Sequence, residues 1–148
     1  MQEFLVNHGL LALFVVSFTA STVLPLGSEW LVVALLIKGL PLETVVFTAT
    51  LGNSLGATTT YGLGLWGTTR LLGTIVHLDP QKVAQAHALY TRYGAWSLLF
   101  SWLPIIGDPL CLAAGAMGLS FPRFAGLIIV GKAARYWAVA ELTTTSLR

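Results

Sequence analysis

Charged residues are scarce in this sequence, and long polar stretches are almost absent. Only 9% of the 148 residues are charged, whereas 55% are hydrophobic and the mean hydropathy is +0.78. Soluble domains carry about a quarter charged residues, so a soluble fold of this length could not bury so much apolar surface. Residues 4–28 and 44–69 contain no Asp, Glu, Lys or Arg. Each run exceeds the roughly 20 residues that cross a bilayer core, and we therefore expect an integral membrane protein.

Several classes of function lack their sequence signals. Cys111 is the only cysteine, which excludes an intramolecular disulfide and a cysteine zinc site. The net charge is only +2, and no basic run with interleaved aromatics occurs, so we expect no nucleic-acid partner. Nucleophile-elbow, metal-helix, Walker and dinucleotide motifs are missing. We therefore expect no enzyme, no metal and no cofactor. The N-terminus lacks signal-peptide features, so we expect the first segment to stay in the mature protein.

One segment design occurs twice along the chain. LPLGSEWLVVALLIKGL at 24–40 and LPIIGDPLCLAAGAMGL at 103–119 each place a proline, a glycine and an acid inside an apolar run. At a constant difference of 79 in residue number, Glu29 falls on Asp108, and GNSLG falls on GKAAR in the next apolar segments. We interpret residues 1–148 as a single membrane domain. Repeat one covers about 4–66, a polar linker about 67–92, and repeat two about 93–145.

Proline and glycine interrupt both repeats, because proline removes a backbone donor and clashes with the preceding turn. We expect the breaks at Pro25 and Gly27 and at Pro104 and Gly107, with Ser28 and Asp108 as N-caps of the helices that follow. The half-helices, at 29–38 and 108–118, are about 15 Å long, which is half a bilayer core. The helices before and after them should cover 4–24, 42–66, 93–103 and 121–145.

The predicted fold class is therefore an all-α integral membrane protein. It would be an inverted repeat of two re-entrant helical hairpins, each followed by a transmembrane helix. In the linker, Asp79-Pro80 and the helical spacing of apolar residues predict a short amphipathic helix at the membrane surface. Basic residues are more numerous on the linker side, so the positive-inside rule places residues 67–92 in the cytoplasm. We expect a multi-pass protein of the bacterial inner (plasma) membrane.

The two breaks should face each other, since non-helical backbone survives in a bilayer only beside protein or a water-filled cavity. Glu29 and Asp108 stand at the two half-helix starts, and Lys132 and Arg135 lie three residues apart on the last helix. An ionisable group near the bilayer centre costs about 2.5–3.5 kcal/mol, so these four residues need partners. Asn53 occupies in repeat one the place of Lys132 in repeat two, and we expect it to line the same cavity.

Two interpretations of this constellation remain open. In the first, the acids only cap helices and pair with Arg135 and Lys132 as structural staples. In the second, the bases attract an anionic headgroup in a partly hydrated cavity while a carboxylate takes or releases a proton. Paired broken helices of this kind recur at substrate sites of secondary transporters. Gly52 and Gly56 also have two interpretations, close packing within the chain or the face of a homo-oligomer.

Four strings of this sequence resemble the DedA family, also called the VTT or SNARE-associated domain family, and its short YqaA-type branch in particular. They are LPLGSEWLVVALL, TATLGNSLG, RYGAWSLLFSWLPIIGDPLCLAAGAM and GKAARYWAVA. The resemblance implies two re-entrant hairpins in an inverted repeat and proton-dependent movement of lipids, including undecaprenyl phosphate, between leaflets. It also implies that Glu29 is the acid of the first hairpin. Many members carry an arginine after the second hairpin's proline, whereas Gly107-Asp108 stands here, so a cation for phosphate would come from Lys132, Arg135 or Arg123.

We therefore expect a transporter or scramblase-like protein that moves an anionic phospholipid or polyprenyl-phosphate lipid between leaflets, linked to protons. Its partners would be that lipid and protons. One alternative is a proton- or cation-coupled carrier of a small solute. Another is a structural or assembly protein of the membrane. A cavity that opens sideways to the bilayer would favour lipid, whereas a path that opens toward water would favour a solute.

Overall fold

Helices make up the part of the chain that the structure describes. This computed structural model describes residues 2–21, 27–67, 80–103 and 106–147, and these contain no strand. The all-α expectation is thereby confirmed. The elements are α1 (Gln2–Ala20), α2 (Glu29–Ile37), α3 (Leu42–Trp66), α5 (Pro80–Tyr93), the 3-10 helix η1 (Gly94–Trp102), α6 (Gly107–Ala116) and α7 (Phe121–Ser146).

The predicted elements and the observed ones differ mainly at two places. The arm expected over 93–103 is a 3-10 helix that begins directly after α5, at Gly94, whose φ of +64° favours glycine. The second half-helix begins at Gly107, one residue before its predicted start. The predicted breaks at Pro25 and Pro104 lie outside the described residues. None of the described helices combines the length and the hydropathy of a membrane span.

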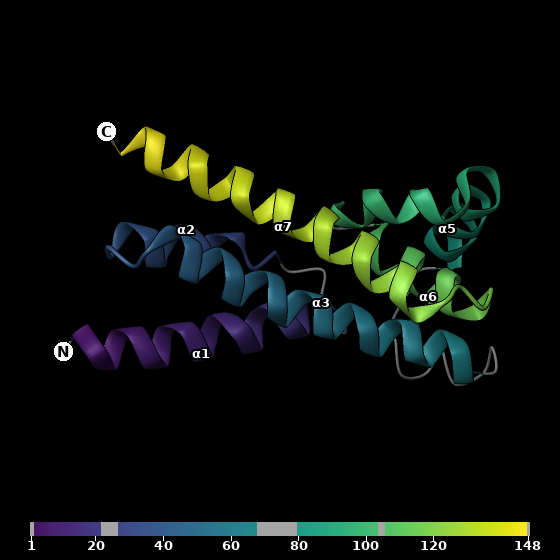
Figure 1. Ribbon diagram of the computed structural model, residues 1–148, viewed down its shortest axis with the longest axis horizontal. Helices are drawn as coiled ribbons and strands as arrows, with labels where there is room; N and C mark the ends of the chain where they lie inside the picture. The colour runs from purple at the N-terminus through teal and green to yellow at the C-terminus, as the bar shows by residue number, and fades with distance from the viewer. Residues whose placement is uncertain (1, 22–26, 68–79, 104–105, 148) are drawn as a thin grey trace.

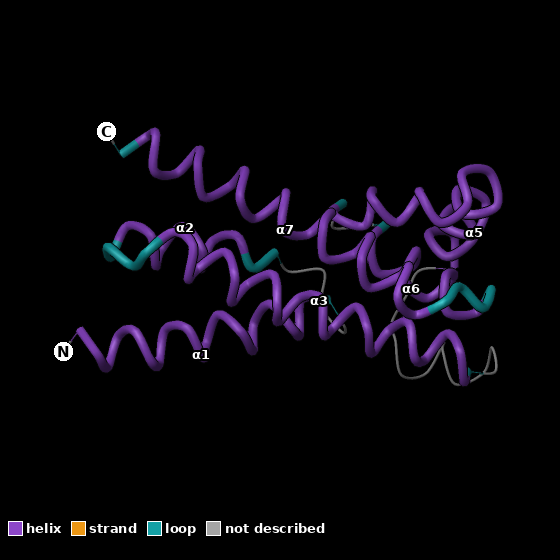
Figure 2. Tube along the Cα trace, viewed as in Figure 1, coloured by secondary structure: helices purple, strands orange, loops and turns teal. Residues whose placement is uncertain are grey.

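The long helices α3 and α7 run through the molecule (Figure 1). Helices α1, α2, α6 and η1 pack against one or both of them, and α5 packs against α6 and η1. The N-terminal end of α1 and the C-terminal end of α7 lie at one end of the molecule, and α5 lies at the other. The α2–α3 loop and the α6–α7 loop also lie at opposite ends (Figure 2). The chain therefore reverses direction once at each end of the molecule, and a long helix, α3 or α7, follows each reversal.

The turn that ends α2 recurs at the end of α6. Gly39 (φ +86°) donates its N–H to the Leu36 carbonyl, and Leu40 donates to the Leu35 carbonyl. Residues 118 and 119 form the same two bonds, with Gly118 at φ +72°. Both turns are helix ends closed by a glycine in the left-handed conformation, which a side chain would strain. The two glycines are 79 residues apart, the difference that relates the two sequence segments.

Two glycines of α3 bring its backbone close to α1. A methyl group at Gly52 would lie 2.6 Å from the Phe14 carbonyl oxygen, and one at Gly56 would collide with the Phe18 carbonyl. Both glycines are buried. Their packing role within the chain is confirmed, and the alternative that they form an oligomer face is wrong, because α1 already covers them.

Two apolar cores lie along α3 and α7. One includes Val45 and Ala49 of α3 with Tyr136 and Ala140 of α7. The other includes Ala57 of α3, Phe124 and Ile128 of α7, and the buried Cys111 of α6. On both long helices, the segment between the two cores carries polar side chains. The fold thus places polar groups at mid-length, with apolar packing on either side.

Candidate functional site

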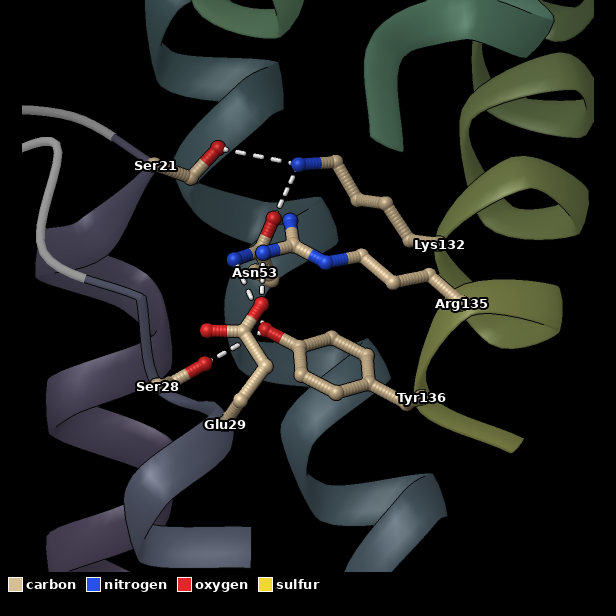
Figure 3. Close-up of polar contacts among 7 residues, drawn as sticks. All are labelled: Ser21, Ser28, Glu29, Asn53, Lys132, Arg135 and Tyr136. Atoms are coloured by element: carbon tan, nitrogen blue, oxygen red, sulfur yellow. Dashed lines mark hydrogen bonds and ion pairs between the residues drawn. The ribbon is translucent and has the colours of Figure 1, made fainter. Parts of the chain in front are cut away.

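Polar side chains from distant parts of the sequence meet between the two apolar cores. α7 contributes the bases and a tyrosine, α3 an asparagine, and the ends of α1, α2 and α6 contribute hydroxyls and acids. Figure 3 shows all of these residues except Asp108. We call the following set the polar cluster: Ser21, Ser28, Glu29, Asn53, Asp108, Lys132, Arg135 and Tyr136.

Three cluster residues share one turn of α7. Lys132, Arg135 and Tyr136 are spaced i, i+3 and i+4, so they lie on the same helix face. Lys132 and Tyr136 are buried, with 3% and 1% of their surface exposed. The Arg135 side chain is 17% exposed. This face therefore presents two cations, of which Lys132 is buried and Arg135 is partly exposed.

Glu29, the first residue of α2, forms an ion pair with Arg135. The Glu29 side chain is 26% exposed. The pair joins the tip of the first hairpin to the last helix, as the structural interpretation expected. Both side chains are partly exposed, although the Glu29 Oε1 atom that contacts Arg135 is itself buried.

Asp108 reaches Lys132 through a hydroxyl group. The Lys132 ammonium donates to Ser21 Oγ at 3.2 Å and to the amide oxygen of Asn53. Ser21 Oγ in turn donates to Asp108 Oδ1 at 3.0 Å. The expected direct pairing of Asp108 with Lys132 is therefore replaced by a bridge. Among the described residues, Lys132 has no carboxylate within ion-pair distance, although its charge is buried.

Tyr136 closes the other side of the cluster. Its hydroxyl shares a 2.6 Å hydrogen bond with Ser28 Oγ and accepts one of 2.9 Å from Asn53 Nδ2. Asn53 thus holds Lys132 with its carbonyl and Tyr136 with its amide group. Buried hydroxyls and amides need such partners, because an unmade hydrogen bond costs about 1–3 kcal/mol away from water. The polar wall of the site is fixed by these contacts.

The predicted capping roles of Ser28 and Asp108 are wrong. Ser28 stands at the N-cap of α2, but its side chain makes no capping bond. Helix α6 begins at Gly107 after Ile106, so Asp108 lies inside its first turn. Both side chains instead bond across the molecule, to Tyr136 and Ser21. These oxygens join separate segments of the chain, a use that no local pattern reveals.

The cluster surrounds a cavity of about 20 Å³. Asn53, Asp108, Lys132 and Arg135 line it together with Ser101 of η1. A cavity needs about 10–15 Å³ to hold a water molecule, so this one has room for about one. Ser101 Oγ is buried and has no hydrogen-bond partner among the described residues. The cavity has space for a water molecule but not for a phosphate group.

The structure brings together all five residues predicted to bind substrate or protons: Glu29, Asn53, Asp108, Lys132 and Arg135. Their roles stay predictions. Of the predicted hairpin breaks, Gly27 lines the cavity, Gly107 lies against the Ser101 carbonyl, and Pro25 and Pro104 lie outside the described residues. No group of three His, Cys, Asp or Glu side chains in the described ranges converges as metal ligands would.

Sequence reasoning missed three residues of the site. Tyr136 was detectable, since it lies four residues after Lys132 on the same helical face. Ser21 stands four residues after Ser17 in an apolar helix, a weak sign of a polar contact. Ser101 has no such local signal. It enters the site only because η1 packs against α7.

Comparison with known proteins assigns the chain to a family. Residues 24–143 match the VTT domain, a segment that holds every cluster residue except Ser21. The chain belongs to the VTT-domain (DedA) family. The resemblance that the sequence motifs carried is thereby confirmed. No solved structure matches this VTT-domain chain.

Relatives of this VTT-domain chain have nearly the same length. It is 40% identical over 139 residues to the inner membrane protein YqaA of Escherichia coli K12, with 93% of each chain covered. The identity and coverage are the same for YqaA of Shigella flexneri. A Haemophilus influenzae protein named as uncharacterized is 37% identical over 155 residues, covering 98% of this chain and 94% of its own. The expected location in the bacterial inner membrane is confirmed.

Proposed function

We propose that this VTT-domain protein moves an anionic lipid between the leaflets of the inner membrane, as a transporter or scramblase and not as an enzyme. The observation that carries the proposal is the pair of cations on α7. Lys132 is buried without a direct carboxylate partner in the described ranges, and Arg135 holds a carboxylate that is itself partly exposed. Guanidinium and ammonium groups are the usual protein ligands of phosphate. An anionic headgroup is therefore a ligand that this site could hold.

We also propose that the chain is an inverted repeat of two re-entrant hairpins, each followed by a membrane-crossing helix. Asn53 and Lys132 hold corresponding positions in the two segments, and their side chains contact each other. Two equivalent residues touch each other where a two-fold axis passes between them. Inverted repeats of transporters are related by such an axis, with the substrate site at the repeat interface. The polar cluster lies at that place in this chain.

The size of the cavity shapes the mechanism. About 20 Å³ cannot hold a phosphate group, so a headgroup must take the place of a group already present. Glu29 is the candidate, since it pairs with Arg135 at the more exposed side of the cluster. Exchange of one anion for another keeps Arg135 paired and avoids an isolated charge in a low-dielectric site. Protonation of Glu29 would release Arg135, and this step would link the movement to protons.

A second candidate is a carrier of protons or a small cation coupled to a small solute. The water-sized cavity, with oxygen atoms of Asn53, Ser101 and Asp108 on its wall, favours this alternative. In that case the cluster would never open far enough for a headgroup. Ion flux without lipid movement would identify it.

Reconstitution into liposomes tests the proposal. A fluorescent phosphatidic acid in the inner leaflet becomes accessible to an external quencher when it crosses the bilayer. We expect the protein to accelerate this step, and we expect Arg135→Gln and Lys132→Gln to remove the acceleration. Lys38→Gln is the control, because Lys38 is an exposed base outside the polar cluster. Equal rates in all variants would refute the assigned roles, and no acceleration by the wild type would refute lipid movement.

A further inference from the structure

A large groove lies between α3 and α7, apart from the small polar cavity. Its volume is about 920 Å³, and its lining includes Phe47, Leu51 and Leu55 of α3 with Ile129, Ala133 and Trp137 of α7. Phe47 is 68% exposed, Ile129 49% and Trp137 45%. A contiguous apolar surface of this kind needs an occupant or a hydrocarbon environment. We call this feature the α3–α7 groove.

The groove is lined by residues that neighbour members of the polar cluster in sequence on α3 and α7. Thr50 and Ser54 line it and flank Asn53 in sequence, and Ala133 follows Lys132. Thr50 and Ser54 are each 8% exposed, and their hydroxyls have no hydrogen-bond partner in the described parts of the chain. The groove and the polar cluster therefore use neighbouring residues of the same two helices. A molecule with an anionic end and an apolar body could place its anionic end at the bases of the polar cluster and its apolar body in the groove.

The dimensions of the groove limit its occupant. The lining residues on α3 run from Glu43 to Thr58, which is about 22 Å at 1.5 Å per residue. This length exceeds the roughly 15 Å of one leaflet's hydrocarbon. The groove is therefore long enough for an extended hydrocarbon chain to lie along it.

The chemistry of the lining points the same way. Helices that pack in membranes use small residues for close approach. In this chain the α3 glycines Gly52 and Gly56 already serve that purpose against α1. Among the described residues that line the groove there is no glycine and no base, and Glu43 at one end is the charged member. Such a lining suits a hydrocarbon tail and repels an anionic headgroup.

From these observations we propose that the α3–α7 groove binds one hydrocarbon tail of the lipid whose headgroup enters the polar cluster. The inference rests on the proposed function and adds a second subsite to it. The tail would lie along α3 and α7 while its headgroup approaches Arg135. Because the groove is longer than one leaflet, the tail would stay seated while the headgroup passes the middle of the bilayer.

A photoreactive lipid tests this subsite. The protein is reconstituted in phosphatidylglycerol vesicles that contain a phosphatidic acid with a diazirine in its tail, and labelled residues are mapped by mass spectrometry. We expect about tenfold more labelling in the groove than at Val130 and Leu142, exposed apolar residues outside it, which corresponds to a preference of about 1.4 kcal/mol. Ala133→Phe should fill the groove and abolish this excess. The neighbouring substitution Ala134→Phe, at an exposed position outside the groove, should preserve it.

Two outcomes would overturn the inference. Labelling of the groove equal to that of Val130 and Leu142 would mean that only bulk lipid touches it. A disulfide-linked dimer of Leu51→Cys at low protein-to-lipid ratio would mean that a second copy covers it. The outcome for lipid movement is separate. Groove-specific labelling in a protein that accelerates no lipid movement would retain the tail site and refute the proposed function.

Discussion

Substitution of Gly52 by alanine tests the packing of α3 on α1 and, with it, the placement of Ser21 in the polar cluster. The new methyl group would lie 2.6 Å from the Phe14 carbonyl oxygen and 3.2 Å from Ser17 Cβ. Ordinary contact begins near 3.4 Å, so α1 must retreat by about 0.8 Å. Overpacking of this kind costs about 1–3 kcal/mol. For a chain of this size, 1 kcal/mol corresponds to roughly 2–4 °C, and we expect Tm to fall by about 2–12 °C.

Thermal unfolding in detergent, followed by size-exclusion chromatography of the heated samples, measures this change. Gly62→Ala is the control, because Gly62 lies on the same helix and a methyl group there would meet no other described element within 4 Å. Removing that glycine should stabilise the helix by about 0.5–1 kcal/mol. An unchanged Tm for Gly52→Ala, or a change in oligomer size instead of Tm, would refute the intrachain packing.

Three further predictions concern the cluster and the turns. Ser21→Ala removes the hydroxyl between Lys132 and Asp108 and should cost about 1–3 kcal/mol, with Ser21→Thr closer to the wild type, as thermal unfolding would show. Tyr136→Phe leaves a buried hydroxyl and an amide unpaired and should lower Tm similarly; no loss would mean that other groups satisfy them. Gly118→Ala should cost about 1–2 kcal/mol because φ is +72°, and Gly118→Asn should cost less; equal losses would argue against backbone strain.

Much of the helical layout could be predicted from local signals. Proline and glycine mark the ends of apolar runs, so the sequence located α2, α3 and α7 to within a few residues. The glycine turns at Gly39 and Gly118 follow from the same chemistry, since both need a left-handed backbone. These features depend on neighbouring residues alone.

The contacts of the site were harder to predict, because they join residues 79 to 111 positions apart. Sequence reasoning placed the acids and bases in one region of the fold, but it assigned Ser28 and Asp108 to helix capping. Each oxygen had two suitable uses, a local backbone N–H and a distant side chain, and only the three-dimensional packing decides between them. The bridge through Ser21 and the α3–α7 groove likewise result from packing between helices, which a linear pattern does not specify.

The most direct test of the account is the pH dependence of phosphatidic acid movement in liposomes, for the wild type and for Glu29→Gln. If a headgroup takes the place of Glu29 at Arg135, protonation of Glu29 should assist the exchange. The account predicts that the wild-type rate rises as pH falls, whereas Glu29→Gln moves lipid at a rate that pH hardly changes. The same pH dependence in both proteins, with Arg135→Gln as active as either, would contradict it.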